Sequence, residues 1–379
     1  MAVAVAHIVG AKLARGIIVT KHGHAGAAPV GMEVFEAGHP IPDSTGIKAA
    51  QAVRALLRDL NARDLVIVAV SGGASALLCA PVEPITLEAK QQTTDLLLSA
   101  GADIFELNCV RKHLSALKGG NLAREAYPAT VLSLLLSDVV GDPPEVIGSG
   151  LTAPDPTTYA QAISILEERG VFERIPAEVR EHLERGARGS LGETPKPGDS
   201  LFENVHNVIV GSNRLALEAA AKQAKIFGYR PLILSSRMQG ETREVARVHA
   251  EILIEAASSG NPIRPPACLL SGGETTVTVR GKGKGGRNQE FALTLAIAMA
   301  GLPNLLALSA GTDGTDGPTD AAGAIATGDT VSRARRLGLE SSDYLARNDS
   351  YSFFEALGDL IRTGPTGTNV MDINLLLAG

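Results

Sequence analysis

The chain has 379 residues, 45% of them hydrophobic and 20% charged, a mixture typical of a folded globular protein with two domains. Its 35 Lys and Arg against 41 Asp and Glu give a net charge of −6, which lacks the basic surplus of a nucleic-acid-binding protein. The cysteines Cys79, Cys109 and Cys268 form no C-x-x-C pair, so we expect neither a disulfide framework nor a zinc site, and a reducing cytoplasmic compartment fits. No apolar run reaches membrane-spanning length, and the N-terminus shows no signal peptide pattern.

Short apolar runs alternate with amphipathic stretches along the chain. The apolar runs predict strands at Ile17–Thr20, Leu65–Val70, Val131–Leu136, Val208–Val210, Pro231–Leu234, Cys268–Leu270 and Leu305–Leu308. Apolar residues repeating every three or four positions predict helices at 49–60, Arg214–Phe227, Glu241–Ala257, Asn288–Met299 and Tyr351–Ile361. This alternation predicts an α/β fold with a mostly parallel, Rossmann-like sheet in the N-terminal domain.

Two Gly- and Pro-rich stretches interrupt the pattern. Arg188–Asp199 is typical of a surface loop, and Ser258–Pro266 is the best candidate for a linker. We therefore expect an N-terminal domain over residues 1–262 and a smaller C-terminal α/β domain over 263–379.

Five predicted strands run directly into loops rich in Gly, Ser or Asp. These loops are Ser71–Ser75, Ser137–Asp142, Gly211–Asn213, Ser271–Glu274 and Ala310–Asp316. Ligands of open α/β sheets bind at the carboxyl ends of strands, where glycine lets them approach the backbone and a following helix attracts anions. One such loop is often a simple turn, but five in one chain favour a phosphate-binding site. None matches the P-loop pattern G-x-x-x-x-G-K-[ST], and no G-x-G-x-x-G opens a helix directly after a strand.

A glycine loop with cationic side chains precedes the predicted helix at 288. Lys282 and Lys284 alternate with glycines, and Arg287 follows where the helix begins. An arginine presents a fork that matches a carboxylate or phosphate with two hydrogen bonds. The alternative is a solvated hairpin tip whose lysines bind nothing.

Carboxylates and a basic segment add to these loops. Asp138, Asp142, Asp313, Asp316 and Asp320 could supply the one or two carboxylates that Mg²⁺ usually takes, or could cap helices and turns. In Asn108–Asn121, the spacing of Arg111, Ser115 and Lys118 predicts one shared helix face, with Gly119-Gly120 as its C-cap, although a solvated basic face would look the same.

Together these segments resemble the two-domain glycerate kinases that end in a MOFRL domain. The resemblance lies in NCVRKHLSALKGG, LLSDVVGDPPEVIGSGLTAPDPTTY, IVGSN, LLSGGETTVTVRGKGKGGRNQEFAL, SAGTDGTDGPTDAAGAI and TGPTGTNVMDINLLL, and extends from Ile17 to Leu377. It implies two α/β domains with a cleft between them, and transfer of the ATP γ-phosphoryl group, with Mg²⁺, to D-glycerate, usually at the C2 hydroxyl. The family also carries an N-terminal strand and a G-A-G-K-A-like loop with a lysine. We find no counterpart here, so we expect an N-terminally truncated domain with reduced activity.

These patterns and the resemblance lead to a set of expected site residues. Arg287 matches the arginine that the family places against substrate, and Asp138 or Asp313 would bind Mg²⁺ or orient the acceptor hydroxyl. Phosphate or substrate oxygens would contact Ser71, Gly72, Gly73, Ala74, Ser75, Lys118, Asn213, Ser271, Gly272, Gly273, Glu274, Lys282 and Lys284. The alternatives are a hydroxypyruvate reductase and a nucleotide-binding protein with impaired catalysis, and a homodimer stays open.

Overall fold

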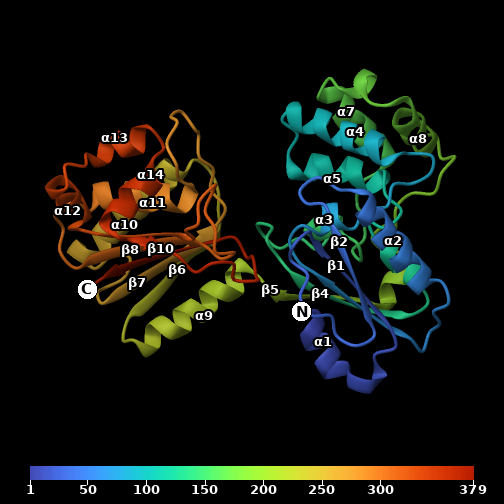
Figure 1. Cartoon of the computed structure of the whole chain (residues 1–379), viewed down its shortest axis with the longest axis horizontal. Coiled ribbons are helices and arrows are strands. Elements are labelled where there is room, and N and C mark those ends of the chain that lie inside the picture. Colours follow the sequence, from blue (N-terminus) through green and yellow to red (C-terminus); the bar gives the residue numbers. More distant parts are fainter. The chain divides into compact units, whose positions relative to one another are not determined.

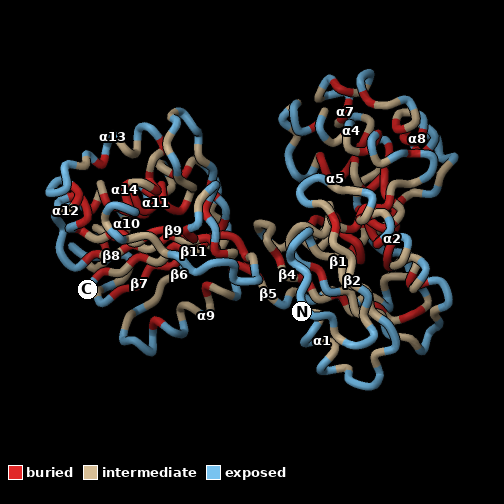
Figure 2. The backbone as a smooth tube through the Cα atoms, viewed as in Figure 1, coloured by how far each residue is buried: buried red, intermediate tan, exposed pale blue.

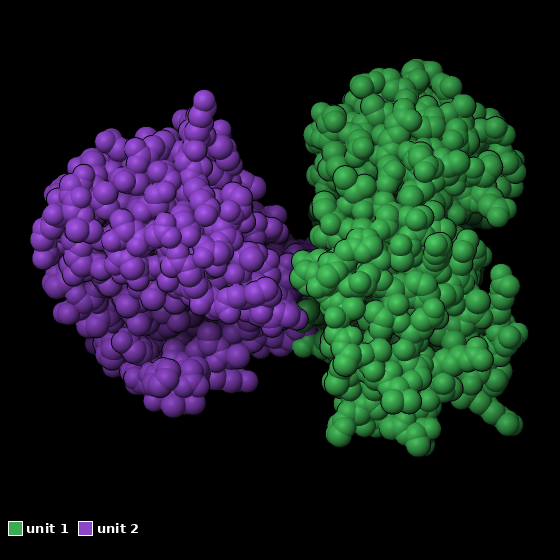
Figure 3. Space-filling model, in the orientation of Figure 1, with its two compact units in different colours: residues 1–136, 142–210 green, residues 137–141, 211–379 purple.

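The structure is a computed structural model that describes all 379 residues. The chain forms two compact units, coloured separately in Figure 3. Unit 1 comprises Met1–Leu136 and Asp142–Val210, and unit 2 comprises Ser137–Gly141 and Gly211–Gly379. The division therefore falls at 210/211 and not at the expected 262/263. The reason is that the elements on both sides of Ser258–Pro266 pack into the same sheet and helix layer of unit 2.

Unit 1 contains two small sheets with parallel strand pairs (Figure 1). Strand β1 (Gly16–Lys21) pairs with β2 (Met32–Ala37), and β3 (Leu65–Val70) pairs with β4 (Thr130–Leu136), both in parallel. Strand β5 (Val205–Gly211) completes the order β3-β4-β5. The parallel pairing predicted from the apolar runs is thus confirmed in this unit.

The helices of unit 1 gather mainly around one apolar cluster. They are α1 (Ala2–Val9), α2 (Ser44–Leu57), α3 (Ala74–Leu77), α4 (Leu87–Ser99), α5 (Ile104–His113), α6 (Asn121–Ala126), α7 (Tyr159–Glu168) and α8 (Ala177–Ala187), with short 3₁₀ turns at Gly10–Lys12, Ile147–Ser149, Phe172–Arg174 and Ser200–Asn204. Helices α4, α5, α7 and α8 bury Leu97, Val110, Leu166 and Leu183 against one another. A capping box of Asp103 and Glu106 fixes the start of α5, because it satisfies backbone N–H groups that have no partner within the helix.

The basic segment after α5 differs from the prediction. The helix ends at His113, and Ser115 forms a β-bridge with Pro81. Gly119 and Gly120 have φ angles of +60° and +82° and lead into α6, so they do not cap α5. Arg111, Ser115 and Lys118 therefore share no helix face.

Unit 2 is built on one six-stranded sheet in the order β10-β9-β8-β11-β7-β6. The strands are β6 (Arg230–Met238), β7 (Ala267–Gly273), β8 (Leu305–Gly311), β9 (Gly323–Thr327), β10 (Leu360–Ile361) and β11 (Asp372–Ala378). Only β6 and β7 pair in parallel, whereas β11 inserts antiparallel between β7 and β8. The sheet of this unit is therefore mixed, since its last strand returns between two strands that precede it in sequence.

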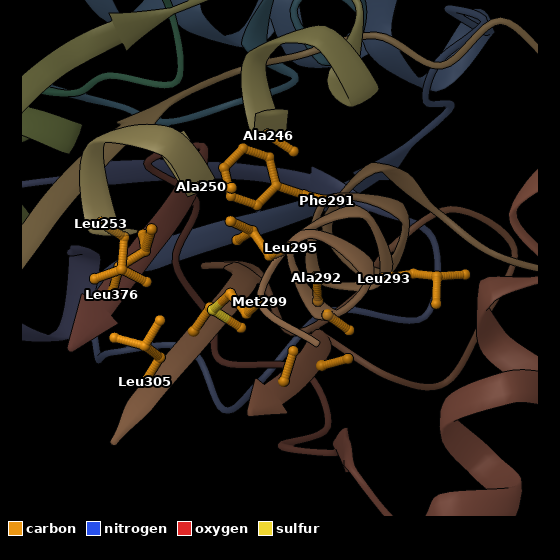
Figure 4. Packing of buried hydrophobic residues seen from close by; sticks show 14 of the residues in the cluster. Ala246, Ala250, Leu253, Phe291, Ala292, Leu293, Leu295, Met299, Leu305 and Leu376 are labelled. Atoms are coloured by element: carbon orange, nitrogen blue, oxygen red, sulfur yellow. The ribbon is translucent and has the colours of Figure 1, made fainter. Parts of the chain in front are cut away.

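Helix α11 is the buried centre of unit 2. The helices here are α9 (Asn213–Ile226), α10 (Thr242–Ser259), α11 (Arg287–Ala298), α12 (Thr330–Arg336), α13 (Ser341–Ala346) and α14 (Ser350–Leu357). Figure 2 shows the buried segments, among them the whole of β7 and most of α11. Phe291 and Leu295 pack against Ala246, Ala250 and Leu253 of α10 (Figure 4). Because α11 is buried along most of its length, its N-terminus is held in a fixed position. The candidate site begins at this N-terminus.

The C-terminal helix is shorter than predicted. Helix α14 ends at Leu357 because Gly358 adopts φ +74°, and Leu360–Ile361 pairs with β9. None of the helices is both long and apolar enough to cross a membrane.

Candidate active site

The candidate site lies at one edge of the sheet of unit 2. Strands β7 and β8 both run antiparallel to β11, so their carboxyl ends meet the amino end of β11 at the same edge. Asp372, the first residue of β11, is paired with Gly273 on one side and with Gly311 on the other. The loops predicted at Ser271–Glu274 and Ala310–Asp316 begin later than expected, because Ser271–Gly273 and Ala310–Gly311 are the last residues of β7 and β8. These strand ends flank the Asp372 carboxylate.

Arg287 is the first residue of α11 and reaches two carboxylates at this edge. Its Nε lies 2.6 Å from Asp372 Oδ2, its Nη2 3.1 Å from Asp372 Oδ1, and its Nη1 2.7 Å from Glu274 Oε1. Burial alone would lower the arginine pKa, but the hydrogen bonds and charge of Asp372, and then the charge of Glu274, raise it. The side chain keeps 33% of its surface exposed, so the guanidinium is held by two carboxylates and is still accessible from solvent.

A second buried carboxylate, Asp316, lies beneath the N-terminus of α11. Its oxygens accept from the backbone N–H groups of Asn288 (3.0 Å) and Gln289 (2.8 Å). The Asn288 amide bridges Asp316 Oδ1 (3.2 Å) and Asp372 Oδ1 (2.9 Å). Burial raises the pKa of Asp316 to about 6 and also raises the pKa of Asp372, against the lowering effect of Arg287. The two buried carboxyls therefore form a coupled pair.

Glycine makes this close packing possible at two positions. A Cβ on Gly286 would lie 2.3 Å from Asp316 Cγ, and a Cβ on Gly273 would lie 2.2 Å from the Met238 carbonyl oxygen. Gly273 also has φ +139°, a conformation that side chains disfavour. The two glycines thus let the backbone approach the carboxylates and the neighbouring strand.

Two further carboxylates act on the partners of Arg287: the charge of Asp313 acts on Asp372, and the charge of Asp138 acts on Glu274. Asp313 accepts from the backbone N–H (2.9 Å) and the hydroxyl (3.0 Å) of Thr315. Glu274 has a raised pKa, chiefly through burial and then through the charges of Asp372 and Asp138, which partly oppose the lowering by Arg287. No group of three His, Cys, Asp or Glu residues has the geometry of a complete protein metal site. The carboxylates do suit Mg²⁺, which commonly takes one or two and completes its shell with water and phosphate oxygens.

The glycine loop before α11 is anchored at several points. Asn348 Oδ1 accepts from the N–H groups of Arg280 (2.8 Å) and Gly281 (3.0 Å), and Lys284 N–H donates to Asp349 Oδ1 (3.1 Å). The Lys284 ammonium lies 3.9 Å from the centre of the Tyr351 ring, a cation–π contact. Lys282 is exposed. The two lysines, which the sequence pattern does not distinguish, therefore differ in their contacts.

Two other predicted residues lie beneath the edge. Asn213 is buried, and its amide nitrogen donates to the carbonyl oxygens of Val370 (2.9 Å) and Asp372 (2.7 Å). A Cβ on Gly272 would meet Asn213 Oδ1 at 2.1 Å, so the two are in direct contact. Ser271 is also buried and lies 2.8 Å from His249 Nε2. Both side chains support the edge from below.

The Ser71–Ser75 loop belongs to unit 1 and is described by itself. It follows β3 and turns at Gly73 (φ +85°) into the single turn of α3. Ser71 is exposed, and Gly72, Gly73, Ala74 and Ser75 are half-buried. Lys118 is fully covered and donates to the Ser75 carbonyl and, at 2.8 Å, to its hydroxyl. Burial, and next the charge of Lys90, lowers the Lys118 pKa well below its ordinary value. Lys118 therefore holds the loop from inside the protein.

Sequence reasoning missed Asp372 and Asn288. Both lie within segments that carry the resemblance, GGRNQE and VMDINLLL, but no pattern in the sequence distinguishes them there. Asp372 directly precedes a mostly apolar run. A carboxylate at the start of a predicted strand is therefore the sequence feature that could identify it. Its partners follow only from the strand order.

Comparisons with known proteins match this architecture. Residues 1–184 match the family described as Domain of unknown function (DUF4147), and residues 267–372 match the MOFRL family. A D-glycerate 2-kinase of Thermotoga maritima is 43% identical over 98% of this chain and 86% of its own length. A crystal structure of glycerate kinase from Thermotoga maritima superposes with a TM-score of 0.94, at 42% identity, over 100% of this chain and 88% of that one. A putative hydroxypyruvate reductase of Agrobacterium vitis is 46% identical over 96% of this chain and 81% of its own length.

The fold and the arginine–carboxylate edge define a two-unit α/β protein with a MOFRL domain in its C-terminal part. The chain belongs to the MOFRL-type, two-domain glycerate kinase family.

Proposed function

We propose that this protein is an ATP-dependent D-glycerate kinase that phosphorylates the C2 hydroxyl and releases 2-phosphoglycerate and ADP. The observation that carries the proposal is Arg287, held at a fixed position by Asp372 and Glu274 at a loop-rich sheet edge. Glycerate is a small anion, and its phosphorylation places more negative charge beside its carboxylate. A guanidinium fork is the group that suits both anions.

The chemistry requires positioning and charge stabilisation more than covalent catalysis. The C2 hydroxyl oxygen attacks the γ-phosphorus, the bond to the β–γ bridging oxygen breaks, ADP leaves with that electron pair, and the hydroxyl proton goes to a nearby base. In this proposal Arg287 binds the glycerate carboxylate or the transferring phosphoryl group, and Asp138 orients the hydroxyl. The backbone N–H groups of Ser71–Ser75 bind phosphate or substrate oxygens. The Glu274 N–H is not available for this role, because it donates to the Met238 carbonyl oxygen at 2.9 Å.

Mg²⁺ is the metal that this donor set suits. Asp313 and Asp138 would hold it with their carboxylate oxygens, and the metal would neutralise phosphate charge. Two carboxylates with phosphate oxygens satisfy the usual Mg²⁺ shell, which agrees with the lack of a complete protein cage.

The second candidate is hydroxypyruvate reduction, because some relatives carry that name. A nicotinamide enzyme of the Rossmann type needs a strand, a glycine turn and a helix in succession. Gly281–Gly286 has the spacing G-x-G-x-x-G directly before α11, but residues 274–280 form no strand. The observed context therefore favours the kinase.

The test is to supply the purified protein with D-glycerate, ATP and Mg²⁺ and to follow ADP release. A parallel reaction with hydroxypyruvate and NADH measures reduction. We expect glycerate-dependent ADP release and no NADH oxidation. NADH oxidation without ADP release would reject the proposal.

A further inference from the structure

Ser75 and Lys118 form a close side-chain pair within unit 1. Ser75 Oγ lies 2.8 Å from Lys118 Nζ, which also donates to the Ser75 carbonyl oxygen. On its other side, Ser75 Oγ lies 2.8 Å from Ser149 Oγ, and Ser149 Oγ lies 2.8 Å from Asn108 Oδ1. The Ser75 hydroxyl is therefore held between a lysine and a serine–asparagine pair.

The backbone presents Ser75 at a sharp turn between a strand and a helix. Strand β3 ends at Val70, Gly73 turns the chain with φ +85°, and Ser75 is the second residue of α3. In one large class of hydrolases the nucleophilic serine occupies such a junction, because the turn exposes its oxygen. Ser75 is half-buried, whereas Lys118 and Ser149 expose only 1% of their surface. Ser75 is thus the accessible member of the group.

Lys118 has no carboxylate among its contacts. Both hydrogen-bond partners of its side chain are oxygens of Ser75. The charged groups that act on it are Lys90 of α4 and Arg111 of α5, which lower its pKa in addition to burial, and the Cys79 thiol, which acts in the opposite direction. These surroundings favour a neutral amine over a buried cation. A neutral amine has a lone pair that can accept a hydroxyl proton, and buried lysines of this kind serve as general bases.

The loop that leads to Ser75 has unused hydrogen-bond donors. The backbone N–H groups of Gly72–Ser75 have no acceptor in the protein. The next N–H, that of Ala76, donates to the Gly73 carbonyl oxygen at 3.0 Å, which differs from hydrolases that use the N–H after the nucleophile. Free N–H groups beside a nucleophile can bind the oxygen that becomes negative when a carbonyl is attacked. A carbonyl oxygen can therefore bind where the proposed function places phosphate.

We propose that Ser75 and Lys118 are a nucleophile and its general base, and that unit 1 hydrolyses small carboxylic esters through an acyl-Ser75 intermediate. This activity goes beyond glycerate phosphorylation and does not depend on it. An ester is the class of substrate that fits, because the group supplies a nucleophile, a base and donors for a carbonyl oxygen. Ser–Lys pairs replace the Ser–His pair in some hydrolases. The half-buried position of Ser75 restricts the substrate to a small acyl group.

The reaction balances in two halves. Ser75 Oγ forms a bond to the ester carbonyl carbon while its proton passes to Lys118 Nζ, and the carbonyl oxygen becomes negative. The bond between that carbon and the alcohol oxygen breaks, Lys118 returns the proton to the alcohol, and acyl-Ser75 remains. Water then adds to the acyl carbon with Lys118 again as base. The bond to Ser75 Oγ breaks, the serine recovers a proton, and the carboxylic acid leaves.

The first test asks whether Ser75 is the nucleophile. The full-length protein is supplied with p-nitrophenyl acetate, and sustained release of p-nitrophenolate is followed. We expect turnover that is lost in Ser75→Ala, and acid quenching at early times followed by peptide mass mapping should locate an acetyl ester on Ser75. Ser258→Ala is the control, because the exposed Ser258 hydroxyl donates only to the Glu255 carbonyl oxygen. No turnover by the native protein, or native turnover in Ser75→Ala, would overturn the proposal.

The second test distinguishes a general base from a loop anchor. Lys118→Met removes the base, and Lys118→Arg keeps N–H donors for the Ser75 carbonyl but cannot accept a proton, since arginine stays charged. Both should lower ester turnover by roughly 10²-fold or more, because general base catalysis contributes about 10² to 10⁴. Lys222→Met, which changes an exposed lysine of α9, should turn over ester at the native rate.

Thermal unfolding of each variant shows whether it is folded. A folded Lys118→Met or Lys118→Arg that turns over ester at the native rate would show that Lys118 only anchors the loop, and would contradict the proposal.

Discussion

Arg287 and Asp372 form a two-point ion pair, with Nε 2.6 Å from Oδ2 and Nη2 3.1 Å from Oδ1. Asp372 is only 4% exposed, whereas the arginine side chain remains one-third exposed. The carboxylate thus fixes a guanidinium that still has a free side toward solvent. Fixed charge of this kind is effective in catalysis because it needs no reorganisation when substrate charge develops.

Replacement of Arg287 should affect both activity and stability. Arg287→Ala should lower kcat/KM for glycerate by roughly 10²-fold or more, since arginines in phosphoryl transfer contribute up to about 10³ to 10⁵. It should also cost roughly 1–3 kcal/mol of unfolding free energy, because Asp372 is left buried without its cation. Steady-state kinetics and thermal unfolding measure the two effects.

Arg287→Lys separates charge from geometry. A lysine keeps the cation but cannot contact both carboxylates as a fork, so stability should largely return while kcat/KM stays low. Arg247→Ala removes an exposed arginine paired with Glu244 on the same helix and is the control. Native activity in Arg287→Lys would show that the positive charge alone, without the two-point geometry of the guanidinium, sustains catalysis.

Lys118→Met should stabilise the fold and weaken nucleotide or substrate binding. The folded-state pKa of Lys118 is lowered by burial, so the unfolded chain binds more protons than the folded chain between that pKa and the ordinary value near 10.5. Native stability should therefore rise with pH across this window, and the rise should be smaller in Lys118→Met. KM should increase, because Ser75 loses its anchor.

Lys222→Met, an exposed lysine of α9, is the control for Lys118→Met. Chemical denaturation at a series of pH values gives the slope of the unfolding free energy against pH for each protein. Equal slopes in Lys118→Met and the native protein would show that Lys118 is not desolvated in solution.

Gly273→Ala should be strongly destabilising. The added methyl would meet the backbone oxygen of Met238 at 2.2 Å, and φ is +139°. Gly301→Ala is a matched control, since Gly301 also has positive φ (+83°) but open space around it. Strain of that kind alone costs about 1 kcal/mol. A loss in Gly273→Ala no greater than in Gly301→Ala would show that the strand can relax.

The fold could be predicted from the sequence wherever burial leaves a pattern. The predicted strand Cys268–Leu270 falls within β7, whose residues are all buried, because a strand covered on both faces must be apolar. The helix predicted at 351–361 extends past the end of α14 at Leu357. The apolar residues of the two-residue strand β10 continue the helical spacing, so the pattern does not reveal that the helix ends before Gly358. The antiparallel β11 was not foreseen, since a returning strand depends on partners distant in sequence.

The candidate site was only partly predictable for the same reason. Arg287 was found because a cation at a predicted helix start is chemically conspicuous. Asp372 is conspicuous only after β11 inserts between β7 and β8. The burial of Lys118 could not be predicted either, because charged residues are expected at the surface.

The two lysines of the glycine loop should differ in function. Both lysines are exposed, but the Lys284 ammonium contacts the Tyr351 ring, whereas Lys282 makes no cation–π contact. Lys282→Ala should therefore raise KM for ATP several-fold, with an effect that weakens at high salt, as expected for a solvated charge. Lys284→Ala should act mainly on thermal stability. The opposite ranking in KM would mean that Lys284 leaves the ring when the nucleotide binds.

The most direct test of the central claim is the ³¹P spectrum of the product formed from D-glycerate, ATP and Mg²⁺. A phosphate ester at C2 couples to the single hydrogen on that carbon and gives a doublet, whereas an ester at C3 couples to two hydrogens and gives a triplet. We predict a doublet that grows with the ADP signals. A triplet would reject C2 specificity, and the absence of any new ester together with NADH oxidation by hydroxypyruvate would contradict the kinase itself.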